Sequence, residues 1–261
     1  MIKMFAKKVR MKKEYELARA YAHRGYHCKP EIPENSMAAF RRALEHGMAS
    51  ELDVHLIHDG TLVVFHDDDL KRETGVKGSI ESYDYESLSK LRLEGTGEKI
   101  PTFDEVLELY EDSGLPLLIE LKVVNRNHKE LAKAVADRLK TYKGAFAIQS
   151  FYPRAIMEFR KQMPTVALGQ LSKNYFNRGD GMLKTRIAII ANLLFNRIAK
   201  PDFVSYKQKD RSSKSFRRTI DRKGLGKAAW TIRTPEAYKE ALKSGSVAIF
   251  ENFNPDDVSW D

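Results

Sequence analysis

Acidic, basic and imidazole side chains follow one another through the first half of the chain in short clusters, most of them at the end of an apolar run. The clusters are His23-Arg24-Gly25, Pro33-Glu34-Asn35-Ser36, Glu51-Leu52-Asp53, His66-Asp67 and Glu120-Leu121-Lys122. Carboxylates bind hard divalent cations, imidazoles exchange protons near neutral pH, and arginine and lysine bind phosphate oxygens. Together these residue types predict metal-assisted cleavage of a phosphodiester.

The acidic residues of this series are candidate metal ligands. Glu51 and Asp53 are two positions apart on one predicted strand, so their side chains share a face, and Glu120 ends another predicted strand. Acids at strand ends often only pair with lysine or arginine, and their place within the ordered series is what favours a metal site. We expect Mg²⁺ or Ca²⁺, because both cations take oxygen ligands.

Histidine is the residue best suited to move protons near neutral pH. His23 and His66 each end a predicted strand and precede a residue that suits phosphate or metal, which makes them the candidate general acid and base. The other histidines are interpreted as structural or surface residues: His27, His46, His55, His58 and His128. The sequence does not distinguish which of the two candidates is the acid.

Two basic residues stand close to these candidates. Arg24 follows His23 directly, and Lys122 shares a strand face with Glu120. An arginine can bind two phosphate oxygens at once, and a lysine contributes a compact charge. We therefore predict that Arg24 and Lys122 bind the phosphate, although neutralising the acids would fit the same geometry.

The apolar runs that carry these clusters alternate with helical segments. Eight runs are predicted as parallel strands: Ala18–His23, Ala49–Leu56, Pro116–Lys122, Gly144–Phe151, Thr165–Leu171, Asp202–Tyr206, Lys227–Ile232 and Val247–Asn252. Apolar residues three and four apart indicate five helices: Ser36–His46, Phe103–Tyr110, Leu131–Leu139, Ala155–Gln162 and Pro235–Lys243. Eight such repeats predict an α/β fold, the (β/α)8 or TIM barrel, which typically takes about 250 residues.

One hairpin interrupts the alternation after the second strand. Asp59-Gly60 between two β-favouring runs is a strong hairpin signal. If these two residues form the whole loop, Asp53 lies opposite His66 on the neighbouring strand. Because Glu51 shares the face of Asp53, the hairpin predicts that two acids and one histidine of the site lie together.

The predicted domain organisation is simple. Residues 1–17 are expected to form a basic leader helix that either packs against the barrel or lies on a membrane surface. Residues 18–261 are expected to form the barrel domain. A small insertion at about residues 67–99, rich in glycine and charge, is expected to leave the barrel after the hairpin that follows the second strand.

Composition limits the classes of partner. The formal net charge of +9 and the isoelectric point near 9.4 favour anionic partners, but no nucleic-acid-binding motif is recognised, so we do not expect nucleic acid. The single cysteine, Cys28, excludes an intramolecular disulfide. Without a recognisable secretory signal or membrane-spanning run, we expect a cytoplasmic protein and leave peripheral membrane contact open. The oligomeric state is not predicted.

The ordered clusters resemble the glycerophosphodiester phosphodiesterase family from about Tyr21 to Pro255. The matching motifs are Ala22-His23-Arg24-Gly25, Ile32-Pro33-Glu34-Asn35-Ser36, Glu51-Leu52-Asp53-Val54, Asp59-Gly60, Val64-Phe65-His66-Asp67, Ile100-Pro101-Thr102, Leu118-Ile119-Glu120-Leu121-Lys122, Gln149-Ser150-Phe151 and Trp230-Thr231. The resemblance implies a TIM barrel whose small-molecule substrate is a glycerophosphodiester. It also implies a divalent cation, two catalytic histidines, phosphate-binding basic residues and a pocket lined by Trp230 near the glycerol.

The chain also departs from the family pattern. Its last strand ends in Phe250-Glu251-Asn252 where an Asp-containing turn is usual, His55 stands where a basic residue is common, and Arg186–Phe195 adds an apolar segment. The basic leader and this segment favour one alternative, a lysophospholipase D-like or sphingomyelinase D-like phosphodiesterase. The net charge favours another, a non-catalytic module that binds anionic surfaces.

Overall fold

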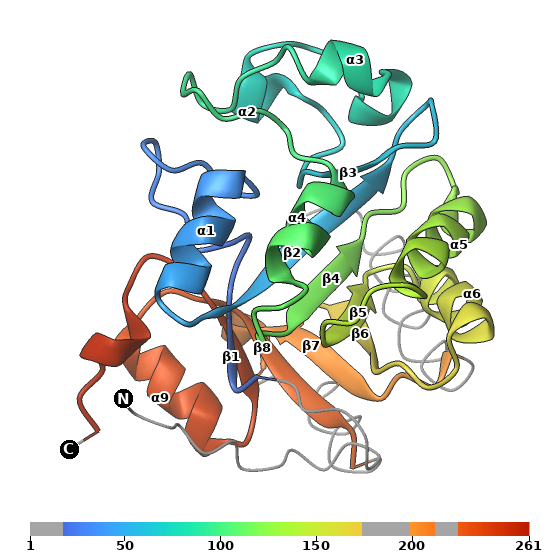
Figure 1. Ribbon diagram of the computed structural model, residues 1–261. Coiled ribbons are helices and arrows are strands. Elements are labelled where there is room, and N and C mark those ends of the chain that lie inside the picture. Colours follow the sequence, from blue (N-terminus) through green and yellow to red (C-terminus); the bar gives the residue numbers. More distant parts are fainter. Residues whose placement is uncertain (1–17, 174–198, 212–223, 261) are drawn as a thin grey trace, which may run out of the picture.

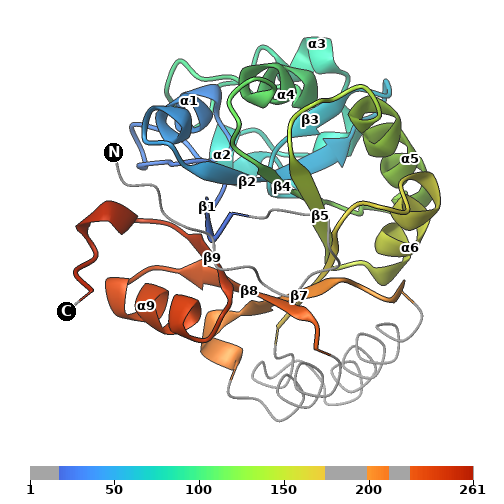
Figure 2. The same ribbon diagram turned by 60° about the horizontal axis from the view of Figure 1, so that its bottom comes forward.

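The computed structural model describes residues 18–173, 199–211 and 224–260, and its strands close into a barrel (Figure 1). Eight parallel strands form it: β1 (Ala20–Ala22), β2 (Ala49–Leu56), β4 (Leu117–Leu121), β5 (Phe146–Ser150), β6 (Leu168–Ser172), β7 (Phe203–Lys207), β8 (Gly226–Ile232) and β9 (Val247–Phe250). They pair in chain order, and β1 closes the ring by pairing with both β2 and β9 (Figure 2). The predicted TIM barrel and its eight strands are therefore confirmed.

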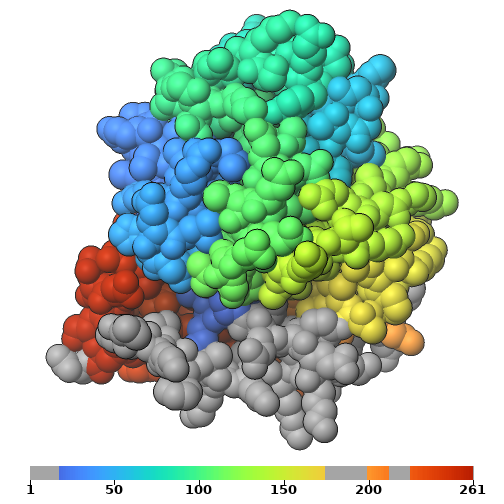
Figure 3. All heavy atoms as spheres, viewed as in Figure 1, coloured from blue at the N-terminus to red at the C-terminus, as the bar shows by residue number. Residues whose placement is uncertain are grey.

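Helices cover the outside of the barrel. They are α1 (Met37–Glu45), α4 (Phe103–Tyr110), α5 (His128–Leu139), α6 (Pro153–Gln162) and α9 (Pro235–Lys243), which confirms the five predicted helices. Ser36, Thr102 and Thr234 begin three of them by accepting a backbone N–H bond in the first turn. In the space-filling view α1, α4 and α5 cover one side of the barrel (Figure 3).

The interior of the barrel is filled in layers. The lower layer is apolar: Tyr21, Ala49, Leu118, Ala147, Ala167, Phe203, Ala228, Val247 and Ile249. Small residues make room for large ones, since a Cβ on Gly169 would collide with the Phe203 ring of the next strand. Side chains two positions further along a strand point the same way. Glu51, Glu120 and Gln149 therefore form a polar layer above Ala49, Leu118 and Ala147.

The hairpin after β2 differs from the prediction by one residue. Strand β3 (Leu62–Val64) pairs antiparallel with β2, with His55 opposite Val63. The loop has three residues rather than two, because the Ile57 N–H donates to the Thr61 carbonyl at 3.0 Å, which pairs these two residues across the turn. Gly60 within the loop takes a left-handed conformation with φ of 87°. Asp53 consequently lies opposite Phe65, whose N–H donates to the Asp53 carbonyl at 3.0 Å, and not opposite His66.

Beyond the hairpin the chain folds into a small unit above the barrel (Figure 1). It contains α2 (Lys71–Thr74), the 3₁₀ turn η1 (Ile80–Ser82) and α3 (Tyr85–Leu88). Its apolar core is separate from the barrel core: Ile57, Val63, Phe65, Leu70, Ile80, Leu88, Leu93 and Ile100. Two further 3₁₀ turns, η3 (Gln208–Asp210) and η4 (Pro255–Asp257), follow β7 and β9.

Two predicted features lie outside the described residues: the leader helix at 1–17 and the apolar segment Arg186–Phe195. Within residues 18–173, 199–211 and 224–260, none of the helices combines the length and the apolar character needed to cross a bilayer.

Candidate active site

A cavity of about 920 Å³ lies at the carboxyl end of the barrel strands. Four of the residues predicted from the sequence line it, namely His23, Arg24, His66 and Trp230. Active sites of TIM barrels occupy this end, because the loops that follow the strands carry their polar side chains there. Trp230 is fixed in the wall by its indole N–H, which donates to the Ser205 carbonyl at 3.1 Å, and by an edge contact with Phe151.

The three predicted metal ligands meet in the polar layer of the barrel. One carboxylate oxygen from each of Glu51, Asp53 and Glu120 lies within 4.8 Å of the others, and all three residues are buried. The register explains the convergence, since Asp53 of β2 is the direct neighbour of Glu120 on β4. Side-chain amides hold two of them: Asn35 Nδ2 donates to Asp53 at 3.0 Å and Gln149 Nε2 to Glu51 at 3.1 Å.

Charge repulsion is built into this cluster. Burial and the negative charges of Asp53 and Glu120 raise the pKa of Glu51 well above its ordinary value. Burial also raises the pKa of Glu120. Although burial would raise the pKa of Asp53 too, Lys122 and His66 hold it below its ordinary value. Asp53 Oδ1 accepts no hydrogen bond from any described residue. Three buried, oxygen-bearing ligands with an unused lone pair fit a hard divalent cation.

The two predicted phosphate-binding residues differ in position. Arg24 lines the cavity, donates from Nη1 to Glu34 at 2.5 Å and lies with Nε 3.5 Å from Asp53. Lys122 is not among the residues that line the cavity, and its Nζ lies 3.1 Å from Glu120 and 3.6 Å from Asp53. Two permanent cations thus face three acidic side chains, and a bound metal ion would relieve the repulsion among the three acids.

A tight turn places Arg24 over the acids. Arg24 and Gly25 both adopt left-handed backbone conformations, and a Cβ on Gly25 would press against Ala39 of α1. In this turn the Arg24 N–H donates to the Glu51 side chain at 3.2 Å. The glycine is therefore required by the close approach of the turn to α1.

Each candidate catalytic histidine is paired with a carboxylate. His23 Nδ1 lies 2.5 Å from Glu251, which follows β9, and His66 Nδ1 lies 2.5 Å from Asp67. Burial and the nearby Arg24 lower the pKa of His23 to about 4, even though Glu251 opposes that shift. His23 is therefore neutral at pH 7 and donates its Nδ1–H to an ionised Glu251. Hydrogen-bonded pairs of this kind fix the tautomer and orientation of an imidazole.

Four residues that support the site were not assigned a role from the sequence. Glu34, Asn35 and Gln149 stood in the recognised motifs, but nothing local told which strand or loop they contact. Glu251 was noted only as part of an unusual ending of the last strand. The signal that was present is its position directly after a barrel strand, where site residues gather.

Glu34 gives a prediction for acid stability. Although burial opposes the shift, the charges of Arg24, Arg72 and Lys29 lower its pKa to about 2 from 4.5, which corresponds to about 3 kcal/mol. A carboxyl with a depressed folded-state pKa stabilises the fold above its unfolded value, and this contribution is lost as the pH falls from 4.5 toward 2.

Glu34→Gln should therefore cost about 3 kcal/mol at pH 7, and the gap between the two proteins should close on acidification. Urea unfolding of both proteins at pH 7, 5 and 3 measures this. A gap that stays constant with pH would show that the carboxylate charge is not the source of the stabilisation.

Comparison with known proteins identifies the family of the chain. The model of the glycerophosphoryl diester phosphodiesterase family matches residues 23–255. A glycerophosphodiester phosphodiesterase of Bacillus altitudinis is 35% identical over 179 residues, which cover 65% of this chain and 72% of that protein. A lysophospholipase D of Rattus norvegicus is 37% identical over 145 residues, which cover 51% of this chain and 44% of that protein.

A solved structure shares the fold over nearly its whole length. The phosphodiesterase of Oleispira antarctica, in complex with the product sn-glycerol-3-phosphate, has a TM-score of 0.76 at 24% identity. The match covers 92% of this chain and 95% of that chain. The barrel, its acidic cluster and its paired histidines define a phosphodiesterase-type TIM barrel. The chain belongs to the glycerophosphoryl diester phosphodiesterase family and is an enzyme of that family, as the sequence predicted.

Proposed function

We propose that the protein hydrolyses glycerophosphodiesters to glycerol 3-phosphate and an alcohol with the help of Mg²⁺ or Ca²⁺. The observation that carries this proposal is the convergence, at one end of the barrel, of three buried carboxylates and two histidine–carboxylate pairs. Family membership supports phosphodiester cleavage. The relative of known structure that is bound to sn-glycerol-3-phosphate supports the glycerol side of the substrate.

Glu51, Asp53 and Glu120 would hold the cation. Bound there, a hard cation polarises the phosphoryl group and stabilises the charge that develops on its oxygens. Arg24, which lines the cavity, binds the phosphate from the solvent side, while Lys122 balances the charge of the acids beneath. The phosphate is thereby oriented between positive groups before any bond breaks.

The two imidazoles move the protons. One accepts the proton of the attacking hydroxyl or water, and the other protonates the leaving alkoxide. The neutral state of His23 at pH 7 suits the accepting role, since Nδ1 already donates to Glu251 and Nε2 is left with a lone pair. His66, fixed by Asp67, would then supply the proton to the leaving group.

Purified protein tests the proposal directly. After treatment with a chelator, addition of Mg²⁺ or Ca²⁺ should release glycerol 3-phosphate from glycerophosphocholine, glycerophosphoethanolamine or glycerophosphoglycerol, measured with a coupled dehydrogenase. No release from any of these diesters with either cation would refute the proposal.

The similarity to a lysophospholipase D supports a second candidate substrate, a diester that retains one acyl chain. The two substrates share the phosphodiester and differ only in the acyl group. The ratio of kcat/KM for glycerophosphocholine and lysophosphatidylcholine therefore separates them. We expect the deacylated diester to be preferred, because the described cavity is lined mainly by charged and polar side chains.

Glu251 is predicted to position His23. Glu251→Gln keeps the size of the side chain but can no longer hold Nδ1–H of His23 with a charged acceptor. We expect kcat to fall by about 10- to 100-fold with little change in KM, in line with other partners that orient a functional imidazole. Because Glu251 raises the pKa of His23, its removal should also shift the acid limb of the pH–rate profile to lower pH. An unchanged profile would mean that Glu251 only stabilises the fold.

A further inference from the structure

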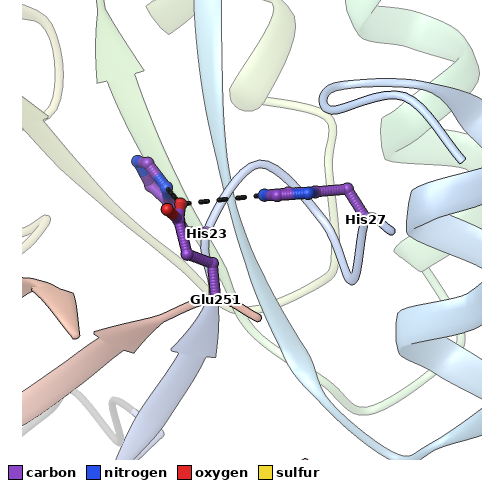
Figure 4. A group of neighbouring side chains, drawn as sticks. All are labelled: His23, His27 and Glu251. Atoms are coloured by element: carbon purple, nitrogen blue, oxygen red, sulfur yellow. Dashed lines mark hydrogen bonds and ion pairs between the residues drawn. The ribbon is translucent and has the colours of Figure 1, made fainter. Parts of the chain in front are cut away.

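A second group of potential metal ligands lies in the wall of the cavity, apart from the three barrel acids. It consists of His23 and His27, from the loop after β1, and Glu251, which follows β9 (Figure 4). One ligand atom of each residue lies within 4.8 Å of the other two. The shared point is Glu251 Oε2, which lies 2.5 Å from Nδ1 of His23 and 3.7 Å from Nε2 of His27.

The imidazole of His27 is buried without a hydrogen bond. Only 8% of the residue is exposed, and neither ring nitrogen has a hydrogen-bond partner in the part of the chain that the structure describes. Its Nε2 faces Glu251 across a gap too long for a hydrogen bond (Figure 4). A buried polar group left unpaired costs about 1 to 3 kcal/mol, so such a group in a folded protein calls for a partner, which is a water, a ligand or an ion.

The donor set selects a different metal from the acidic cluster. Two imidazoles and one carboxylate are ligands that Zn²⁺ takes in three-residue sites, with the fourth position left for water. Mg²⁺ and Ca²⁺ instead prefer oxygen ligands throughout. Glu251 supplies the required negative charge, because the neighbouring His23, His27 and Arg233 lower its pKa against the effect of burial.

The spacing is close to that of a tetrahedral zinc site. Zinc–nitrogen and zinc–oxygen bonds of about 2.0 to 2.1 Å place two ligand atoms roughly 3.3 Å apart. The two separations from Glu251 Oε2, 2.5 Å and 3.7 Å, lie on either side of that value. Side-chain movements of less than about 1 Å, with no change of the barrel, would bring all three ligands into place.

We propose that His23, His27 and Glu251 form an inhibitory site for a borderline divalent cation, with Zn²⁺ as its best-fitting occupant. Zinc bound to Nδ1 of a neutral imidazole requires the ring proton to move to Nε2. The lone pair with which His23 would accept a proton from the nucleophile is then gone. The binding part of this inference stands on geometry alone, and the inhibition rests on the proposed function.

Binding is tested in protein that carries Cys28→Ser, because the exposed thiol of Cys28 also lines the cavity and a thiolate is itself a ligand for zinc. Excess Mg²⁺ fills the acidic cluster. We expect calorimetry to show one Zn²⁺ per chain, and Co²⁺ to give the visible absorption of a tetrahedral complex. His27→Gln should weaken zinc binding by at least about 10-fold, whereas His58→Gln, in the exposed hairpin loop, should leave it unchanged.

Activity gives the second readout. Zinc should inhibit glycerol 3-phosphate release by the Cys28→Ser protein and by its His58→Gln variant, and inhibition of the His27→Gln variant should need at least about 10-fold more zinc. His27→Asn replaces His27→Gln if that variant does not fold. Equal zinc binding by the His27 variant and its control would overturn the site. So would the absence of any zinc binding beyond that of the acidic cluster. If no protein shows diesterase activity, the proposed function fails, while calorimetry and the cobalt spectrum still decide the site.

Discussion

Replacing either His23 or His66 by alanine should lower kcat by about 100- to 10,000-fold, the usual contribution of a positioned proton-transfer group. Each imidazole lines the cavity and is held at Nδ1 by a carboxylate, so each is oriented for a single task. Glycerol 3-phosphate release at saturating substrate and cation measures the effect.

The exposed His58 provides the matched control, and His58→Ala should keep full activity. The double variant should be hardly less active than either single one, because groups that act in one proton-transfer sequence are not additive. Full activity in His23→Ala or in His66→Ala would contradict the assignment of that residue.

Glu51→Gln should abolish cation binding and lower kcat by about 100-fold or more, while leaving the metal-free fold intact. A bound cation contributes several kcal/mol of charge stabilisation to such a reaction, and the loss of a ligand forfeits most of it. The introduced amide can still be satisfied, because Gln149 Oε1, which accepts no bond from any described residue, can turn to face it.

The direction in which Glu51→Gln changes the stability of the metal-free protein can also be predicted. The pKa of Glu51 is raised in the folded protein, so its ionised form destabilises the fold at neutral pH. In the presence of a chelator, Glu51→Gln should therefore be at least as stable as the natural protein at pH 7. Its advantage should vanish as the pH falls and the natural carboxyl becomes protonated.

Urea unfolding with and without Mg²⁺ measures both the cation binding and the metal-free stability of the Glu51→Gln variant. The natural protein should gain stability from the cation by mass action, and the variant should not. A variant that loses stability without metal, or that still gains it from Mg²⁺, would show that Glu51 is a structural acid rather than a ligand.

Local sequence patterns were sufficient to predict most of the fold. The eight strands follow from apolar runs between turn residues, and α1 and α4 from periodic apolar residues preceded by the caps Ser36 and Thr102. The register of the hairpin was wrong because Asp59-Gly60 fits both a two-residue and a three-residue loop. Only the packing of Phe65 into the core above the barrel distinguishes them.

The site was predictable to the extent that strand geometry determines it. Glu51 and Asp53 share a face by the period of a strand, and parallel strands bring Glu120 to the same level. The partners that hold these groups come from distant points, as when Glu251 meets His23 across 228 positions of the chain. Such contacts depend on the closure of the barrel between β1 and β9, which no local pattern reports.

His23 connects the two metal proposals, because it is the proposed proton acceptor of the reaction and also a proposed ligand of the inhibitory site. In these proposals the acidic cluster would take a hard cation that the reaction needs, whereas the two histidines with Glu251 would take a softer cation that stops the reaction. Whether a cation would activate or inhibit the enzyme thus depends on which donors it binds, the oxygen atoms of the acidic cluster or the nitrogen atoms of the two histidines.

The most direct test is the position of the activating cation. Crystals grown with Mn²⁺ in place of Mg²⁺ should show one anomalous peak within about 2.3 Å of a carboxylate oxygen from each of Glu51, Asp53 and Glu120. Manganese at any other position, in crystals of a protein that manganese activates, would contradict the site.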